Sequence, residues 1–315
     1  MVDKVFESVF AVFDYLREKR WYIDLRTPPI FEVMQLSEKQ LVACPMPMSP
    51  LYRGQNAIYE PCKPSLYRRA WTKEQTFERL LLLEDFKAIL QDNPEIRDLE
   101  ENGLIVNYTG LAQHYGIETE LIDLTNNPLV AAFFATTTYD ALTDTFSPIL
   151  HYVSMGIIYF FAMGPFWGND NIYPIGMEAL KRPGEQRAYA KVMKEGESLH
   201  QMSFRFWHNP QASIEVWEMT AGGSKLFPYD PMAEKVRVMR KYRIYSTQSL
   251  QKVYDSTPDI ADTYEAARQL MEQSGCTFVN HLPFKYTDNE IKYIKEEYKR
   301  KYPDSFSAPS APTLQ

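Results

Sequence analysis

The feature that most constrains this sequence is an almost wholly apolar segment near the middle of the chain. Residues 126–139 open with Asn126-Asn127-Pro128 and continue as LVAAFFA. A proline in the first turn suits a helix start, because the N–H group that it lacks would have no partner there. A helix that is apolar on every side has to be enclosed by other elements. The sequence therefore predicts a buried central helix that the rest of the fold covers.

The hydrophobic pattern predicts the other elements less directly. Helical spacing of apolar residues occurs at 4–19, 73–91 and 258–274, and a capping-box pattern at Thr287 and Glu290 begins a last helix. Strand-like runs occur at 51–54, 150–162, 187–193, 202–207, 213–219 and 235–246. The predicted elements run in the order helices, a mixed middle, strands and helices. This order favours an α+β fold over a regular alternation of strands and helices. We expect a helical extension with a proline-rich connector at 1–47, a central domain at 48–250, a helical segment at 251–301 and a disordered tail at 302–315.

Composition and charge exclude several classes of function. The net charge of -7 gives little attraction for phosphate backbones, so nucleic acid is not a favoured partner. The most basic stretch, 235–243, has an alternation that predicts a strand with one solvated face. Three cysteines without a Cys-x-x-Cys pair argue against disulfides and zinc, and the five histidines lack metal-site spacing. No apolar run of 18 residues and no signal peptide occur, so we expect a cytoplasmic protein that does not enter a membrane.

Three segments together resemble a known family. The first is Leu51-Tyr52-Arg53-Gly54-Gln55 with the later run 64–68, the second is 110–135, and the third is 182–189. Their order is similar to the FRG domain, with its Tyr/Phe-Arg-Gly start, Gln-His-Tyr-Gly block, Leu-Leu-Asp-Trp-Thr block and later Gln-containing strand. The resemblance covers roughly residues 48–195. Glu118 and Glu120 depart from the usual Pro and Arg, and Leu124 replaces the usual Trp.

A more distant resemblance to ADP-ribosyltransferases implies a function. These enzymes often begin their NAD site with a Tyr-Arg-Gly strand, continue with a polar strand end before an apolar helix, and carry Glu or Gln near a later strand. The resemblance implies a mixed or antiparallel sheet split in two and flanked by helices, with NAD as the substrate of ADP-ribosyl transfer or NAD cleavage. It also implies a setting such as a bacterial toxin or phage-defence effector. The implied site residues are Tyr52, Arg53, Gly54, His114, Tyr115, Asp123 and Thr125 for NAD binding, and Glu185 or Gln186 for catalysis.

The chemistry of these residue types agrees with that implication. Arginine can hold a diphosphate with two parallel hydrogen bonds. Gly54 would let the backbone approach the nicotinamide amide, and the ring of Tyr115 would stack on a base. A carboxylate near the ribose would stabilise an oxocarbenium-like transition state, which makes Glu185 the first candidate and Gln186 the alternative.

Other interpretations remain open at this point. Arg53 and Asp123 also suit a structural ion pair, and Asp123 and Thr125 precede a helix as capping residues do. A module that senses a nucleotide or a partner without catalysis would keep the same pocket. Two further alternatives are a nucleic-acid-modifying protein and a Cys62–His114 nucleophile pair. The residues do not distinguish protein, nucleic acid, small molecule or water as the acceptor of ADP-ribose.

Overall fold

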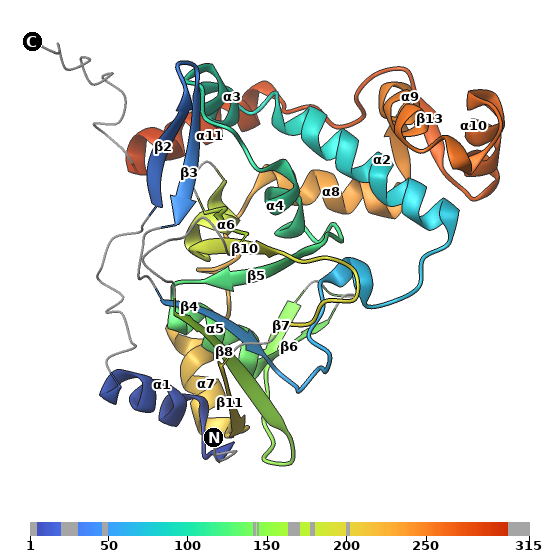
Figure 1. Ribbon diagram of the computed structural model, residues 1–315. Helices are drawn as coiled ribbons and strands as arrows, with labels where there is room; N and C mark the ends of the chain where they lie inside the picture. Colours follow the sequence, from blue (N-terminus) through green and yellow to red (C-terminus); the bar gives the residue numbers. More distant parts are fainter. Residues whose placement is uncertain are drawn as a thin grey trace, which may run out of the picture.

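The computed structural model describes residues 5–19, 31–45, 50–140, 143, 145–162, 171–176, 180–199 and 202–301. A seven-stranded sheet forms its centre, with helices on both sides (Figure 1). In spatial order its strands are β1 (Val5–Phe6), β11 (Met202–Trp207), β8 (Met155–Ala162), β4 (Pro50–Gln55), β5 (Leu121–Thr125), β10 (Ala188–Val192) and β9 (Ile172–Pro174). The β1–β11 pair is parallel and the other pairs are antiparallel. The protein is therefore a mixed α+β fold, as the element order predicts.

The middle of the sheet is its weakest junction. β4 pairs with β8 over six positions, from Pro50 opposite Ala162 to Gln55 opposite Ile157. Its pairing with β5 consists of a single position, Tyr52 opposite Thr125. The two halves of the sheet are therefore joined narrowly, between the two segments that carry the polar motifs.

The apolar segment forms α5 (Pro128–Thr136) and is buried, as predicted. The Asn127 side chain accepts a hydrogen bond from the Leu129 N–H, and Pro128 occupies the first turn. The helix lies so close to β4 that a Cβ atom on Gly54 would stand 1.8 Å from the Ala131 carbonyl oxygen. Glycine at this position is thus required for the packing of α5 against the sheet.

Helices divide between the two halves of the sheet. α5, α1 (Val9–Glu18) and α7 (Pro210–Met219) share one hydrophobic cluster with β4, β8 and β11. A second cluster lies against β5 and β10 and includes residues of α2 (Lys73–Leu90), α4 (Tyr108–Gln113), α8 (Pro231–Tyr242), α9 (Thr247–Ser256) and α10 (Tyr264–Gln273). The C-terminal helices α9 and α10 therefore share a core with α2.

The remaining elements are short or peripheral. α3 (Pro94–Glu101) packs against α11 (Asp288–Lys301), and α6 (Lys181–Glu185) precedes β10. β2 (Phe31–Ser37) and β3 (Gln40–Pro45) form a hairpin within the predicted connector, and β6 (Thr137–Asp140) and β7 (Thr145–Pro148) form another. β12 (Ile244–Ser246) and β13 (Thr277–Val279) pair in parallel. Single helical turns occupy Ser65–Tyr67 and Pro258–Ile260.

Two predicted strands are wrong, because residues 213–219 and most of 235–246 are helical. Both helices begin with a polar cap and a proline: the Asn209 side chain accepts from Ala212 N–H before α7, and the Asp230 side chain accepts from Met232 N–H before α8. The alternation seen over a short window belongs to amphipathic helices that start earlier in the chain.

Four of the five cations in the basic stretch 235–243 are paired with acids, and the fifth, Lys241, is exposed. The ion pairs are Lys235–Glu290, Arg237–Glu234, Arg240–Glu118 and Arg243–Glu78. Because four of these cations have a carboxylate partner, the stretch has little positive charge available for a polyanion.

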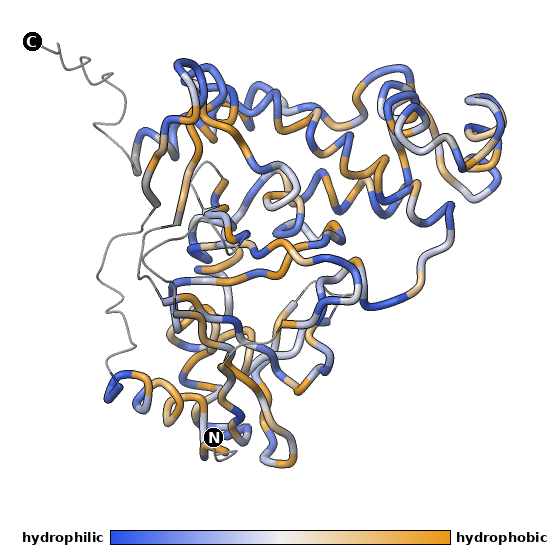
Figure 2. The backbone as a smooth tube through the Cα atoms, viewed as in Figure 1, coloured by the Kyte–Doolittle hydropathy of each residue, from blue (hydrophilic) through white to orange (hydrophobic). Residues whose placement is uncertain are grey.

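The distribution of hydropathy follows this architecture. Figure 2 shows hydrophobic residues along the central strands and hydrophilic residues at outer turns such as the tip of the β2–β3 hairpin. In the described ranges, no helix has the length and apolar character needed to cross a membrane. The tail predicted to be disordered, 302–315, lies outside the described residues.

Candidate functional site

A cleft of about 380 Å³ opens at the narrow junction of β4 and β5. The strand ends, the C-terminal end of α4, one side of α5, the β6–β7 hairpin and the turn between α6 and β10 all contribute to it. The lining residues are Tyr52, Arg53, Gly54, Gln55, Asn56, Tyr59, Arg68, His114, Asp123, Leu124, Thr125, Val130, Ala131, Phe134, Thr137, Tyr139, Phe146, Gln186 and Ala188. Arg53 and the Asp123–Thr125 strand end, two of the motif segments, lie on neighbouring strands and line the same cleft.

Two guanidinium groups, those of Arg53 and Arg68, line this cleft. Arg53 Nη1 donates to the Asp123 carbonyl oxygen at 3.0 Å, while its buried Nε has no partner among the described residues. Arg68 Nε donates to the Lys63 carbonyl oxygen at 3.0 Å. Partial desolvation and, second, the charge of Arg53 lower the pKa of the Arg68 guanidinium, although the residue as a whole is exposed. Within the described part of the chain neither arginine has a carboxylate within 4.0 Å, so the pair is a candidate anion site.

His114 is held by an amide whose orientation is fixed. Gln186 Nε2 donates to the Leu226 carbonyl oxygen at 3.1 Å, so Gln186 Oε1 faces His114 Nδ1 at 3.0 Å. The Gln186 residue is buried, and the His114 side chain is 4% exposed. His114 Nε2 is buried without a hydrogen-bond partner among the described residues and lies 3.8 Å from Asp123 Oδ1. The imidazole is therefore fixed from one side, and its other nitrogen lies near the Asp123 carboxylate.

A second glutamine supports Asp123. The Thr119 hydroxyl accepts from the Leu121 N–H at 3.2 Å and donates to Gln113 Oε1. Gln113 Nε2 then donates to Asp123 Oδ1. The Asp123 side chain remains 46% exposed, so the carboxylate is oriented by the protein and still open to the cleft.

Aromatic rings and one more unpaired polar atom complete the cleft. Tyr59 and Tyr139 are each more than half exposed, and the Tyr139 ring packs on Phe146 with centroids 5.0 Å apart. Gln55 Nε2 donates to Cys62 Sγ at 3.4 Å, while the buried Gln55 Oε1 has no partner among the described residues. With Arg53 Nε and His114 Nε2, three buried polar atoms of the cleft lining have no hydrogen-bond partner among the described residues.

Not all of the sequence-predicted residues enter this cleft with their functional groups. Tyr115 is buried in the core, and its hydroxyl donates to Asp230. Glu185 is exposed at the end of α6 and is not one of the lining residues. It precedes the strand without belonging to it, because α6 ends at Glu185 and β10 begins only at Ala188.

Three other predicted residues contribute mainly to structure. The Tyr52 ring is fully buried and packs against Phe160, so this residue contributes little but backbone to the cleft. The Thr125 hydroxyl donates to the Gln186 carbonyl oxygen at 2.7 Å and accepts from the Asn127 N–H at 3.0 Å. This ties the end of β5 to the turn that carries Gln186. Gly54 makes room for α5, as described above.

Sequence reasoning missed several residues of the cleft. Arg68 belongs to the 64–68 run that carries the resemblance, and Gln113 precedes His114, so both had a local signal. Tyr59, Tyr139 and Phe146 had none, because tertiary packing alone brings them to the cleft. The alternative Cys62–His114 pair is not formed: Cys62 contacts Gln55, and His114 bonds to Gln186.

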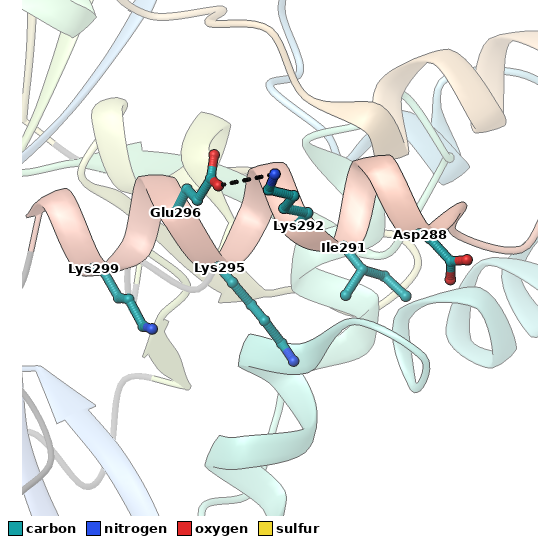
Figure 3. A pocket seen from close by; sticks show the side chains of 6 residues that line it. All are labelled: Asp288, Ile291, Lys292, Lys295, Glu296 and Lys299. Atoms are coloured by element: carbon teal, nitrogen blue, oxygen red, sulfur yellow. Dashed lines mark ion pairs between the residues drawn. The ribbon is translucent and has the colours of Figure 1, made fainter.

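A second depression lies along α11 (Figure 3). Its volume is about 360 Å³, and its lining comes from this one helix, with Lys292 and Glu296 forming an ion pair at 3.8 Å. Solvated side chains of a single helix do not converge on a ligand, so the depression is not a candidate site. Across the described residues, no group of three His, Cys, Asp or Glu side chains could hold a metal ion.

Comparison with protein families identifies the segment that builds most of the cleft. The family model for the FRG domain matches residues 49–143, which include β4, α4, β5 and α5. Comparisons with curated proteins and with solved structures gave no match. The matched segment supplies Arg53, Arg68, His114 and Asp123, while Gln186 comes from outside it. Residues 49–143 of this chain are an FRG domain.

Proposed function

We propose that the cleft binds NAD and that the protein is an ADP-ribosyltransferase or an NAD glycohydrolase. The observation that carries this proposal is the convergence of unlike groups in one cleft. Two guanidinium groups without carboxylate partners among the described residues, an oriented carboxylate and a buried imidazole all face the same space. Such a mixture suits a ligand that is anionic at one end and reacts at a sugar carbon at the other.

The arginines account for binding of the diphosphate. Desolvation and, second, the nearby charge of Arg53 lower the pKa of Arg68, and an anion between the two guanidinium groups would offset both effects. Arg53 keeps its Nε–H for a ligand while Nη1 is held by the Asp123 carbonyl oxygen. Tyr59 and Tyr139 offer exposed rings on which a base would stack.

Asp123 is the carboxylate that suits the reaction in this geometry. Cleavage of the nicotinamide–ribose bond develops positive charge on the ribose, and a fixed negative charge nearby stabilises it. Glu185 does not line the cleft, whereas Asp123 is held by Gln113 and is 46% exposed within it. The proposal therefore assigns the charge-stabilising role to Asp123.

A second candidate function is a module that binds the nucleotide without cleaving it. In the described lining of the cleft, Asp123 is the single carboxylate, and one of its oxygens already accepts a hydrogen bond from the protein. A sensor needs the arginines and the aromatic rings but does not need that carboxylate. Binding without nicotinamide release is the signature that would distinguish it.

The test compares a carboxylate that lines the cleft, Asp123, with one that does not, Glu185. Asp123→Asn keeps the shape and the acceptor for Gln113, so it should lower nicotinamide release by ~10²–10³-fold while NAD still raises the melting temperature. Glu185→Gln, at the exposed end of α6, should leave both measurements unchanged. Equal loss in the two variants, or loss in Glu185→Gln alone, would reject the assignment. Stabilisation by NAD without any release by wild type would select the sensor.

An effector role in toxicity or phage defence follows from the same proposal. If the protein consumes NAD in a cell, then its expression in bacteria should arrest growth and lower cellular NAD. Asp123→Asn should relieve both effects at equal protein level. Growth arrest that persists in Asp123→Asn would separate toxicity from the proposed chemistry.

A further inference from the structure

The hydrogen bonds around His114 determine which nitrogen of its neutral imidazole carries the hydrogen. The Leu226 carbonyl oxygen can only accept, so the Gln186 group that faces it at 3.1 Å is the NH2 group. Gln186 Oε1 is then the atom 3.0 Å from His114 Nδ1, and an amide oxygen can only accept as well. His114 Nδ1 must therefore carry a hydrogen. In the neutral ring, Nε2 is left with a bare lone pair.

That lone pair faces another acceptor. Asp123 Oδ1 lies 3.8 Å from Nε2, and Gln113 Nε2 donates to the same oxygen. Two acceptors at this distance do not bond to each other, so a group with a donor hydrogen is needed between or beside them. Both border the cleft, and Nε2 is buried with no partner in the described part of the chain. A hydroxyl, a water molecule or an amine on the ligand side would satisfy it.

From this geometry we propose that Gln186 is a positioning residue which fixes His114 as the Nδ1–H tautomer, and that His114 Nε2 accepts the proton of the group that attacks the ribose. The inference rests on the proposed function for its second part only. In the step, the bond between the ribose C1′ atom and the nicotinamide nitrogen breaks, and its electron pair leaves with neutral nicotinamide. The oxygen or nitrogen of the acceptor bonds to C1′, and its proton passes to Nε2. The imidazolium that results faces the Asp123 carboxylate.

The proposal gives Gln186 a role different from direct contact with the ribose. An amide at this place would supply only a neutral dipole to an oxocarbenium ion. Its carbonyl oxygen is already committed to His114 and its NH2 group to Leu226. Gln186 therefore acts through His114, in the way that an orienting carboxylate holds the imidazole of a catalytic triad.

His208 provides an internal reference for a direct test. Its Nε2 lies 2.8 Å from the Asn56 carbonyl oxygen, so it should be the Nε2–H tautomer, and burial lowers the pKa of its imidazole. Long-range proton–nitrogen correlation spectra of the whole protein should show opposite tautomers for His114 and His208, assigned with His114→Gln and His208→Gln. Gln186→Leu should release His114 from the Nδ1–H form. Gln186→Glu should retain it when its carboxyl group is protonated, because the O–H then donates to the Leu226 carbonyl oxygen and the other oxygen accepts from Nδ1–H. Gln251→Leu, at an exposed position of α9, is the matched control.

Activity supplies the second readout. Gln186→Leu should lower kcat for nicotinamide release by up to ~10⁴-fold, the loss caused by a wrong histidine tautomer in serine proteases, with KM for NAD little changed and with recovery in Gln186→Glu. An Nε2–H tautomer for wild-type His114, or no change in Gln186→Leu, overturns the positioning role. A changed tautomer with unchanged kcat overturns the proton transfer. If wild type releases no nicotinamide, the proposed reaction and the proton transfer both fall, while the spectra still decide the positioning role.

Discussion

Substitution of the two cleft arginines should weaken ligand binding to very different extents. Arg53 is partly buried and has one hydrogen bond to the protein, through Nη1, while its Nε has no partner in the described part of the chain. A charge-assisted hydrogen bond to phosphate contributes ~1.5–3 kcal/mol, so Arg53→Met should weaken binding of ADP-ribose by ~10- to 100-fold. Arg68 is exposed, and exposed ion pairs contribute ~0.2–1 kcal/mol, so Arg68→Met should cost about fivefold at most.

Salt should separate the two contributions further. Solvent screens an exposed charge much more than a buried one, so the effect of Arg68→Met should disappear in 0.5 M salt while that of Arg53→Met persists. The assay is calorimetric titration with ADP-ribose at low and high salt, with melting curves to verify folding. Arg237→Met, which removes an exposed cation of α8 paired with Glu234, is the control and should not alter affinity. Equal losses that both vanish in salt would refute the account, since they would indicate non-specific attraction.

Three further predictions concern stability. Gly54→Ala should destabilise the fold by several kcal/mol or prevent folding, because the new Cβ would stand 1.8 Å from the Ala131 carbonyl oxygen. Urea unfolding or the soluble yield measures the loss of stability, and an unfolding midpoint equal to that of wild type would contradict the prediction. Asp85→Ala should cost ~3–5 kcal/mol in urea unfolding, because it leaves three buried donors of the two serines at the start of α9 without their acceptor, each worth ~1–3 kcal/mol. A loss under ~1 kcal/mol would contradict this. Burial raises the pKa of Glu95 to about 8, so its contribution to stability is complete below pH 4.5 and is lost as the pH rises to about 8. Glu95→Gln should accordingly be more stable than wild type at pH 8.5 and gain nothing at pH 4, as measured by urea unfolding at both values.

The parts of the fold that could be predicted from the sequence have strong local signals. The Asn127-Pro128 start and the apolar run that follows admit one outcome, a buried helix, and α5 is that helix. The polar ends of β4 and β5 could be placed together because their side chains interrupt apolar strands at the two motif segments. Each signal lies within a short stretch of sequence, although the two motif residues Arg53 and Asp123 are 70 residues apart.

The rest depends on tertiary structure or on competing local signals. α7 and α8 show alternation over a few residues, yet the caps at Asn209 and Asp230 start helices that override it. Glu185 was the first catalytic candidate, just before a predicted strand, but α6 ends there and Arg187, with φ of 47°, turns the chain before β10 begins. As a result Gln186 is buried at the cleft, and its neighbour is exposed on the surface.

The roles of individual polar groups could not be predicted from residue types either. The sequence offers His114 as a ligand-binding residue and Gln186 as a catalytic alternative. Only the position of the Leu226 carbonyl oxygen determines which way the Gln186 amide points, and so which imidazole nitrogen carries the proton. That atom is 40 residues away along the chain.

If the cleft between β4 and β5 binds the diphosphate and nicotinamide-side ribose of NAD, a crystal structure of the protein with ADP-ribose should show it. The diphosphate should lie within hydrogen-bond distance of the Arg53 and Arg68 guanidinium groups, and the terminal ribose beside Asp123 and His114 Nε2. Density for the ligand elsewhere on the protein, or an empty cleft at millimolar ADP-ribose, would contradict it.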